Sequence, residues 1–245
     1  MLFYIRARRV RGEHKQPGEF RQSQNWIGGA TISDAVFVPP VHHSIEELIS
    51  DIEKFVHTEE YYFPELLKIA LVHYQFETIH PFLNGNGRVG RLLITLYLVS
   101  KGILKQPVLY LSDFFERNRT LYYDNLMRVR EKDDLLRWFK FFLVGIIETA
   151  KSGVQTFDNI LRLQNRVDLQ IQGLGSRTAN AQKVILYLYR KPIIDAAKVG
   201  EVAGISAASA YKLIADLEQF GVLREITGSK RGKLYVFSDY IDLFR

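Results

Sequence analysis

Apolar residues recur at helical spacing through much of the first 150 residues. In the segment 45–55, apolar side chains three and four positions apart follow Ser44 and Glu47, whose types and spacing form a capping box. The same periodicity predicts further helices over 64–77, 88–101, 112–130 and 133–151. We therefore expect residues 1–150 to form a mainly α domain.

Residues 17–40 break the helical pattern. Pro-Gly, Gly-Gly and Pro-Pro pairs separate short apolar runs there, which favours a β-hairpin or an extended flap over a helix. We expect this flap to stand as the one extended element in a bundle of helices.

The chain changes character after residue 150. Residues 151–176 are more polar and predict a linker helix that ends near Gly173 and Gly175. Helices are then predicted over 179–189, 196–203 and 207–220, followed by strands over 222–226 and 233–237 that flank a basic turn. This order is typical of a small winged helix-turn-helix domain, which we expect at 177–245.

Composition narrows the class of protein. The 245 residues include no cysteine, so a disulfide framework, a thiol nucleophile and a thiolate metal site are excluded. The apolar run around 92–99 is far too short to span a bilayer, and the N-terminus lacks the apolar core of a signal peptide. We therefore expect a soluble cytoplasmic protein with no membrane partner. The net charge of +6 is compatible with a polyanion partner or with simple solubility.

Residues 80–91 read His-Pro-Phe-Leu-Asn-Gly-Asn-Gly-Arg-Val-Gly-Arg and carry the candidate chemistry. His80 is the one group in this stretch whose ordinary pKa lies near neutrality. The turn at 85–87 can present backbone N–H groups to an anion, and the helix that follows adds the positive end of its dipole. Arg88 and Arg91 supply planar donors that match phosphate oxygens. A base beside a phosphate cradle points to chemistry on a nucleotide.

This stretch resembles the signature of the Fic family, His-x-Phe-x-Asp/Glu-Gly-Asn-Gly-Arg-x-x-Arg. Seven of its specified positions coincide, and only Asn84 departs, since the family usually has a carboxylate there. The segments 17–21, 26–29 and 38–40 resemble the branch of the family that carries a C-terminal winged helix. The resemblance covers nearly the whole chain, and it implies a Fic-type helical bundle with a hairpin flap.

The resemblance also implies an activity, the transfer of AMP from ATP to a Ser, Thr or Tyr hydroxyl of a target protein, including self-modification. His80 would be the general base. The nucleotide would be held by the residues of the signature loop and by a tyrosine pair near the base, namely Asn84, Gly85, Asn86, Gly87, Arg88, Arg91, Tyr122 and Tyr123. Ile27, Gly28, Gly29 and Ala30 match the part of the flap that clamps the target in extended form. A homodimer is a further implied partner.

Two departures from the family pattern bear on activity. Asn84 offers Mg²⁺ a neutral oxygen instead of a carboxylate, so we expect weaker metal binding. In addition, no Ser/Thr-x-x-x-Glu-Gly/Asn sequence precedes the flap, because Glu13 and Glu19 lack the upstream hydroxyl residue. In the family, that glutamate pairs with the second arginine of the signature and blocks productive ATP binding. Either an N-terminal part that carries this glutamate is missing from the sequence, or restraint comes from elsewhere. If nothing replaces the glutamate, we expect Arg91 to be free for the γ-phosphate and nucleotide binding to be constitutive.

Other interpretations stay open for several of these residues. Tyr122 and Tyr123 could be core aromatics, and the flap could be an ordinary edge hairpin. His73, Glu77 and His80 do not have the spacing of a zinc-protease motif. In the C-terminal domain, Ser209, Lys212, Lys230 and Arg231 are candidate DNA contacts, although the alanines of 207–210 favour a protein-docking role.

Two further functions compete with AMP transfer. One is a DNA-binding regulator whose Fic domain is weak or silent. The other is a Fic enzyme that removes AMP or transfers another phosphate-containing group, which the missing glutamate disfavours.

Overall fold

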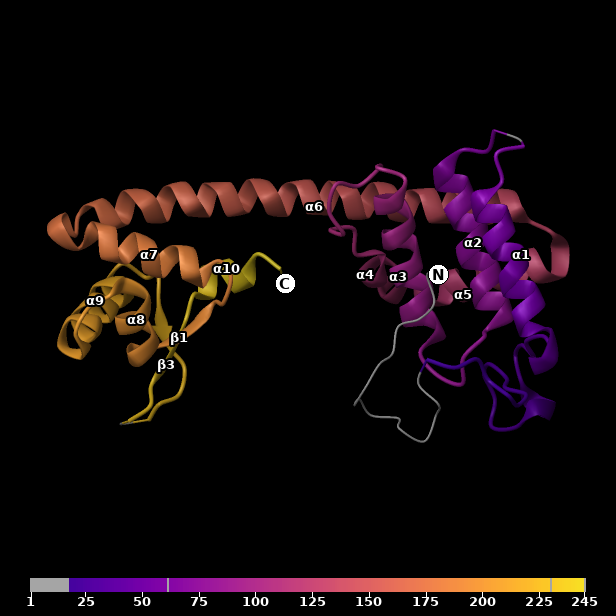
Figure 1. Cartoon of the computed structure of the whole chain (residues 1–245), viewed down its shortest axis with the longest axis horizontal. Helices are drawn as coiled ribbons and strands as arrows, with labels where there is room; N and C mark the ends of the chain where they lie inside the picture. The colour runs from indigo at the N-terminus through magenta and orange to yellow at the C-terminus, as the bar shows by residue number, and fades with distance from the viewer. Residues whose placement is uncertain (1–17, 61, 230, 245) are drawn as a thin grey trace. The chain divides into compact units, whose positions relative to one another are not determined.

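The computed structural model of the chain describes residues 18–60, 62–229 and 231–244. It divides into two compact units, Met1–Ala150 and Lys151–Arg245 (Figure 1). Among the described residues, no helix is long and apolar enough to cross a membrane.

The first unit is a bundle of helices around one apolar core. Its helices are α1 (Ile45–His57), α2 (Glu65–Ile79), α3 (Asn86–Ser100), α4 (Leu111–Arg117), α5 (Arg119–Lys132) and the first part of α6 (Leu135–Gln172). Trp138 and Phe142 are fully buried in this core, and the Trp138 indole N–H donates to the carbonyl of Ala70 at 2.9 Å. This hydrogen bond connects α6 to α2, the helix that leads to the signature stretch.

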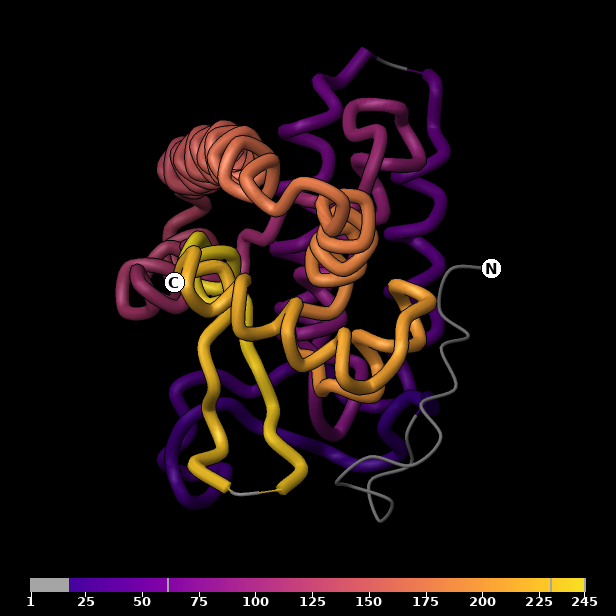
Figure 2. Tube along the Cα trace, turned by 90° about the vertical axis from the view of Figure 1, so that its left-hand side faces the viewer, coloured from indigo at the N-terminus to yellow at the C-terminus, as the bar shows by residue number. Residues whose placement is uncertain are grey.

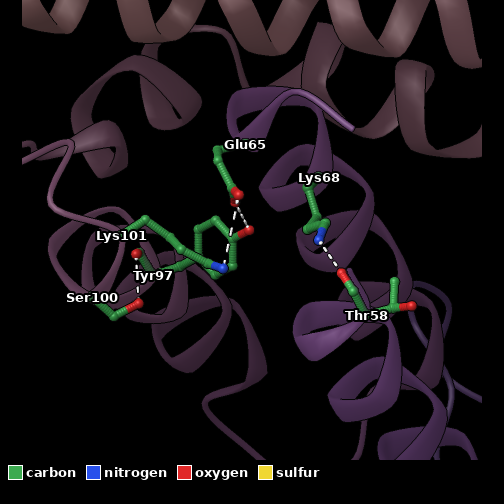
Figure 3. Close-up of polar contacts among 6 residues, drawn as sticks. All are labelled: Thr58, Glu65, Lys68, Tyr97, Ser100 and Lys101. Carbon is green, nitrogen blue, oxygen red and sulfur yellow. Dashed lines mark hydrogen bonds and ion pairs between the residues drawn. The ribbon is translucent and has the colours of Figure 1, made fainter. Parts of the chain in front are cut away.

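The N-terminal end of α2 and the C-terminal end of α3 are held together by polar contacts (Figure 3). The Tyr97 hydroxyl donates to the Glu65 carboxylate, and Lys101 Nζ lies 3.8 Å from Oε1 of the same glutamate. Lys68 Nζ donates to the carbonyl of Thr58 at 3.2 Å and so fastens the loop that precedes α2. These contacts fix one end of the α2–α3 pair, and the signature loop joins the other end.

The flap contains less β structure than expected. A single antiparallel bridge joins Ile27 to Phe37, and a 3₁₀ turn, η2 (Ile32–Asp34), closes the loop between them. Asp34 accepts hydrogen bonds from the N–H groups of Ala30 and Thr31 and from the Thr31 hydroxyl. These bonds hold the pKa of Asp34 at about 2. A 3₁₀ turn capped by Asp34 therefore stands where the paired strands of a regular hairpin were expected.

Helix boundaries differ from the sequence predictions at four places. Ser44 belongs to a short 3₁₀ turn, η3 (His42–Ser44), and makes no side-chain cap, so the capping box predicted with Glu47 is wrong although the helix is present. Helix α3 begins at Asn86 instead of Arg88. The helix predicted over 112–130 is interrupted at Asn118, whose side chain donates back to the carbonyl of Phe114. The fourth difference is the linker.

Helix α6 is one continuous helix of 38 residues, where the sequence predicted two (Figure 2). Figure 2 looks nearly along its axis. The polar stretch after residue 150 contains no proline, and its only glycine before residue 173 is Gly153, a residue that a helix tolerates. The change of composition therefore marks a change of surroundings and not a break in the backbone.

The second unit combines four helices with a small sheet. After the 3₁₀ turn η4 (Gly175–Arg177) come α7 (Thr178–Leu188), β1 (Ile193–Asp195), α8 (Ala196–Ala203), α9 (Ala207–Gln219), β2 (Arg224–Glu225), β3 (Leu234–Val236) and α10 (Ser238–Asp242). The strands are antiparallel in the order β1-β3-β2. Ser206 caps α9 as predicted, since its hydroxyl accepts from the N–H of Ser209. Strand β1 and helix α10 were not predicted, because each is too short to show periodicity.

Candidate functional site

His80 ends helix α2 in a left-handed conformation. Its φ and ψ are 50° and 59°, and its N–H donates to the carbonyl of Phe76. This region is uncommon for a residue other than glycine and costs on the order of 1 kcal/mol, so the surroundings must hold it. Burial lowers the pKa of His80 to about 4, and the positive charges of Arg21 and Arg130 contribute to the shift. The imidazole is therefore neutral at pH 7 and able to accept a proton.

Arg21 supplies the contacts that hold His80 in place. Its guanidinium is almost fully buried and donates only to backbone carbonyls. Nε donates to the carbonyl of His80 at 3.1 Å, and Nη2 reaches those of Pro40 and, at 3.4 Å, Ile79. Nη1 donates to the carbonyl of Ser23 at 3.0 Å. One side chain thus joins both ends of the flap to the end of α2.

Arg130 makes a second connection between the flap and α2. Its guanidinium carbon lies 3.6 Å from the centre of the Phe37 ring, which is a close cation–π contact. Nε lies 3.3 Å from the Thr78 hydroxyl, and Nη2 lies 3.4 Å from the carbonyl of Glu77. Arg21 and Arg130 therefore fix the position of the flap relative to the C-terminal end of α2.

The loop between α2 and α3 is closed by Asn86. Its Oδ1 accepts from the N–H of Phe82 at 2.8 Å, and its Nδ2 donates to the carbonyl of the same residue at 2.7 Å. Asn86 is 2% exposed. This side chain therefore shapes the loop through Phe82. The direct nucleotide contact expected of it stays a prediction. Gly85 precedes it with φ of 84°, a conformation that favours glycine.

Arg88 and Arg91 fold back over the loop glycines. A Cβ on Gly85 would lie 3.3 Å from Nη2 of Arg88, and a Cβ on Gly87 would lie 3.1 Å from Nη1 of Arg91. Arg91 Nε also donates to the Ser112 hydroxyl at 3.0 Å, which fixes the direction of its side chain. Both guanidinium groups thus lie beside the N-terminal end of α3. The unpaired N–H groups and dipole of that helix end add to their attraction for an anion.

Asn84 is exposed on the loop between His80 and α3. An amide oxygen there can contribute one ligand to a hard cation. Across the part of the chain that the structure describes, no group of three or more His, Cys, Asp or Glu side chains could hold a metal ion. Asn84 could therefore provide at most one neutral ligand to such an ion.

The sequence also matches a known protein family. Residues 2–98 match the sequence profile described as the Fic/DOC family.

The chain carries a Fic domain.

Two relatives are named as adenylyltransferases. "Protein adenylyltransferase Fic" of Aedes aegypti is 34% identical over 145 residues, which are 58% of this chain and 26% of that protein. "Probable protein adenylyltransferase" of Aquifex aeolicus is 30% identical over 162 residues, 63% of this chain and 46% of that protein. The chain thus spans between a quarter and a half of the length of these relatives.

The fold is similar to that of a solved Fic family protein from Desulfovibrio desulfuricans. The two share 19% identity and a TM-score of 0.54, and the likeness covers 93% of this chain and 64% of the other. At this identity the likeness establishes the fold: the chain is mainly α with a Fic-type bundle.

Part of the backbone of residues 27–30 is bonded within the flap. The N–H and carbonyl of Ile27 are bonded to Phe37, and the N–H of Ala30 donates to Asp34. Gly28 and Gly29 have φ of 72° and 73°, so they are not extended. The predicted strand-like pairing of a target with these four residues therefore does not fit the flap as it stands, although residues 28–30 are exposed.

Tyr122 and Tyr123 differ in how far they are buried. Tyr122 is 5% exposed, its ring packs on Phe115, and its hydroxyl lies 3.0 Å from Nε2 of His73. This burial favours the alternative that Tyr122 is a core aromatic. Tyr123 is 45% exposed, with Arg119 near its ring face, so one tyrosine of the pair remains available.

The carboxyl group of Glu77 is buried between α2 and α3, next to the signature stretch. No pattern in the sequence indicates a role for it in the site. Burial raises the pKa of Glu77 to about 7, against the opposing charges of Arg91 and Arg130. No hydrogen bond from a described residue reaches its Oε1, which faces Gly90 of α3. His73 beside it is fully buried, with its pKa lowered to about 4 by desolvation. These two groups belong to the interior of the bundle, in agreement with the absence of a zinc-binding pattern.

Sequence reasoning also missed Arg21 and Arg130 as parts of the site. Arg21 lies in a segment, 17–21, that the family resemblance singled out, so a signal was present without a reason for it. Arg130 lies in a polar stretch of α5 that offers no such signal.

The candidate DNA contacts lie in the second unit. Ser209 and Lys212 are exposed on α9, and Arg231 is exposed in the loop between β2 and β3. Ser209 is bonded to Ser206 as part of the cap. Lys230 lies outside the described residues, as does Glu13, the more distant of the two glutamates before the flap.

Proposed function

We propose that this protein is an adenylyltransferase that moves AMP from ATP onto a hydroxyl side chain of a target protein. The observation that carries the proposal is the neutral, backbone-fixed His80 placed directly before the arginine-lined start of α3. The names of the two relatives support the same activity. ATP is the nucleotide that such a reaction requires.

His80 acts as general base in this proposal. A serine, threonine or tyrosine hydroxyl is a weak nucleophile until its proton is removed. As its oxygen bonds to the α-phosphorus, the proton passes to the imidazole and the bond from phosphorus to pyrophosphate breaks. Because the pKa of His80 lies at about 4, nearly all molecules carry the acceptor form at pH 7.

The start of α3 supports the triphosphate. Phosphoryl transfer depends chiefly on positioning and on neutralising charge. Arg88 and Arg91 lie beside this helix end, and the backbone of Gly85 and Gly87 allows their close approach. Asn86 contributes by fixing the loop through Phe82. Tyr123 is the remaining tyrosine that could meet the base.

Asn84 would hold Mg²⁺ through its amide oxygen, and Mg²⁺ would supply charge neutralisation at the phosphates. We predict that Asn84→Asp strengthens metal-dependent transfer several-fold, because a carboxylate adds a full charge to an otherwise neutral protein ligand. The measurement is the Mg²⁺ concentration giving half-maximal label transfer, in wild type and variant. Asn165→Asp, at an exposed position of the second unit, is the matched control. An unchanged half-maximal concentration would show that Asn84 does not contact the metal.

The target remains defined by its chemistry: a protein hydroxyl presented near the exposed residues 28–30, and this chain itself is one such protein.

We infer that the second unit is a winged helix-turn-helix module that docks a protein in preference to reading DNA. The element order α7, β1, α8, α9, β2, β3 supports the first half of this inference. On α9 the exposed Ala207 and Ala208 offer no side chain long enough to read a base edge, whereas Tyr211 is exposed and suits a protein interface.

Binding of a labelled duplex at increasing salt separates the two interpretations. We expect at most a weak gel shift at low salt from Lys212 and Arg231, lost by about 200 mM, because contacts to phosphate alone are salt-sensitive. A shift that persists for one sequence and not for others at that salt concentration would establish a DNA-reading role instead.

A further inference from the structure

Helix α6 carries a line of exposed apolar side chains across its middle. Ile147, Val154, Phe157 and Leu161 are 52%, 64%, 58% and 55% exposed. Together with the exposed Ala150, they alternate at intervals of three and four residues, which is the a/d spacing of a coiled-coil seam. These five residues are called the α6 stripe below.

The α6 stripe lies on the side of the helix that neither unit uses for its core. In the first unit, α6 buries Trp138, Phe141 and Phe142. In the second, it buries Leu163 and Val167. Leu161 precedes Leu163 by two residues, which is more than half a helical turn at 3.6 residues per turn. The stripe therefore does not continue the buried face that α6 presents to the core of either unit, each unit taken by itself.

Side-chain size along the stripe is complementary to a reversed copy of itself. If two α6 helices pair in antiparallel orientation with Val154 facing Phe157 of the second copy, Ala150 faces Leu161. In these layers a smaller side chain meets a larger one, which is how layers interdigitate without voids. Ile147, at the end of the stripe, faces Gln164 and is not part of this match. Because the arrangement has a twofold axis, every such contact occurs twice.

Charge along the stripe fits the same register. Lys151 and Asp158 follow Ala150 and Phe157 directly and occupy equivalent flanking positions, seven residues apart. In the antiparallel register Lys151 of one copy faces Asp158 of the other, on both sides of the axis. Both residues are exposed, and neither forms an ion pair with another described residue.

We propose that two copies of this chain associate through the α6 stripe as an antiparallel helix pair. A second copy is the occupant because the stripe matches itself in size and in charge in one register. The proposal is independent of AMP transfer, since His80 and the nucleotide loop lie outside the stripe. A seam of two heptads is short, so the pairing is expected to depend on protein concentration.

Sedimentation equilibrium over a range of concentrations tests the pairing. The wild-type protein should approach twice the chain mass, and Phe157→Asp should raise the dissociation constant by at least about tenfold, because pairing would bury an unpaired carboxylate. Gln155→Asp adds the same charge to the same exposed stretch of α6 but off the stripe, and it should leave association unchanged. Circular dichroism confirms that both variants remain folded.

A charge exchange tests the register. Lys151→Glu alone and Asp158→Lys alone should each weaken association, since each places like charges opposite one another. The double variant should restore it, because the two charges are then exchanged across the same contact. Weakening that the double variant does not reverse would overturn the antiparallel register.

A monomeric wild type at all concentrations would overturn the proposal as a whole. In that event Val154→Cys, the single thiol of a chain that has no cysteine, identifies the cause. Slow modification of this thiol in the folded monomer would mean that another part of the same chain covers the stripe, and fast modification would mean that the stripe stays bare. Either result contradicts a second copy as its occupant.

Discussion

Replacing His80 by alanine is expected to lower AMP transfer by about 10²-fold or more, the usual contribution of a general base. The neutral imidazole at the end of α2 is the only candidate proton acceptor among the described residues of the signature loop. The fold should survive, because the backbone N–H of residue 80 still donates to the carbonyl of Phe76 when alanine replaces the histidine side chain. Transfer of label from ATP carrying a labelled α-phosphate to proteins of a lysate, or to the chain itself, is the measurement.

The matched control for this variant is His43→Ala. His43 lies exposed in the 3₁₀ turn before α1, so its removal deletes the same side chain away from the loop. Transfer that persists in His80→Ala would exclude general-base catalysis by His80. If wild type and variant are equally silent under every divalent metal, the regulator hypothesis is favoured over an enzyme.

Replacing Arg21 by methionine is expected to destabilise the first unit by about 3 kcal/mol or more, because several buried carbonyls lose their donor at once. The end of α2 and both ends of the flap would be released together. We also expect the acid limb of kcat/KM to move to higher pH. The positive charge of Arg21 helps to keep the pKa of His80 low, so its loss lets that pKa rise.

Arg21→Lys separates the two effects. Lysine keeps the charge but cannot reproduce the planar fork, so stability should fall while the acid limb stays near its original pH. Arg137→Met, at an exposed position on α6, should change neither quantity. Unfolding in urea and initial rates from about pH 3 to about pH 8, a range that includes the acid limb set by His80, are the measurements. An acid limb that is equal in all variants would show that Arg21 acts on stability alone.

The sequence predicts where the candidate chemistry lies, but it does not predict which polar side chains there are buried and bonded within the protein. His80, Arg88 and Arg91 could be predicted because their types and spacing are chemically specific. Asn86 and Tyr122 have equally polar side chains, yet both are buried and bonded inside the bundle. No local pattern distinguishes a polar group that faces a ligand from one that is satisfied by the protein, because that depends on the neighbouring helices.

The connections of the flap were hidden for a related reason. The contacts of Arg21 with His80 and of Arg130 with Phe37 join residues far apart in the chain. Such contacts leave no periodicity in the sequence. Helix α6 was divided in two because its composition changes where its surroundings change, whereas its backbone continues.

Gly90 shows how much freedom the signature stretch has. It stands at one of the two positions between the arginines that the family pattern leaves unspecified. Yet a Cβ there would lie 2.6 Å from Oε1 of Glu77 and 3.1 Å from the Phe76 ring. A side chain at this position would therefore fit only if the buried Glu77 carboxyl and the Phe76 ring moved. The family pattern alone therefore understates how strongly the sequence of this stretch is restricted. Residues that never contact a nucleotide, such as Glu77 and Phe76, also limit which side chains fit there.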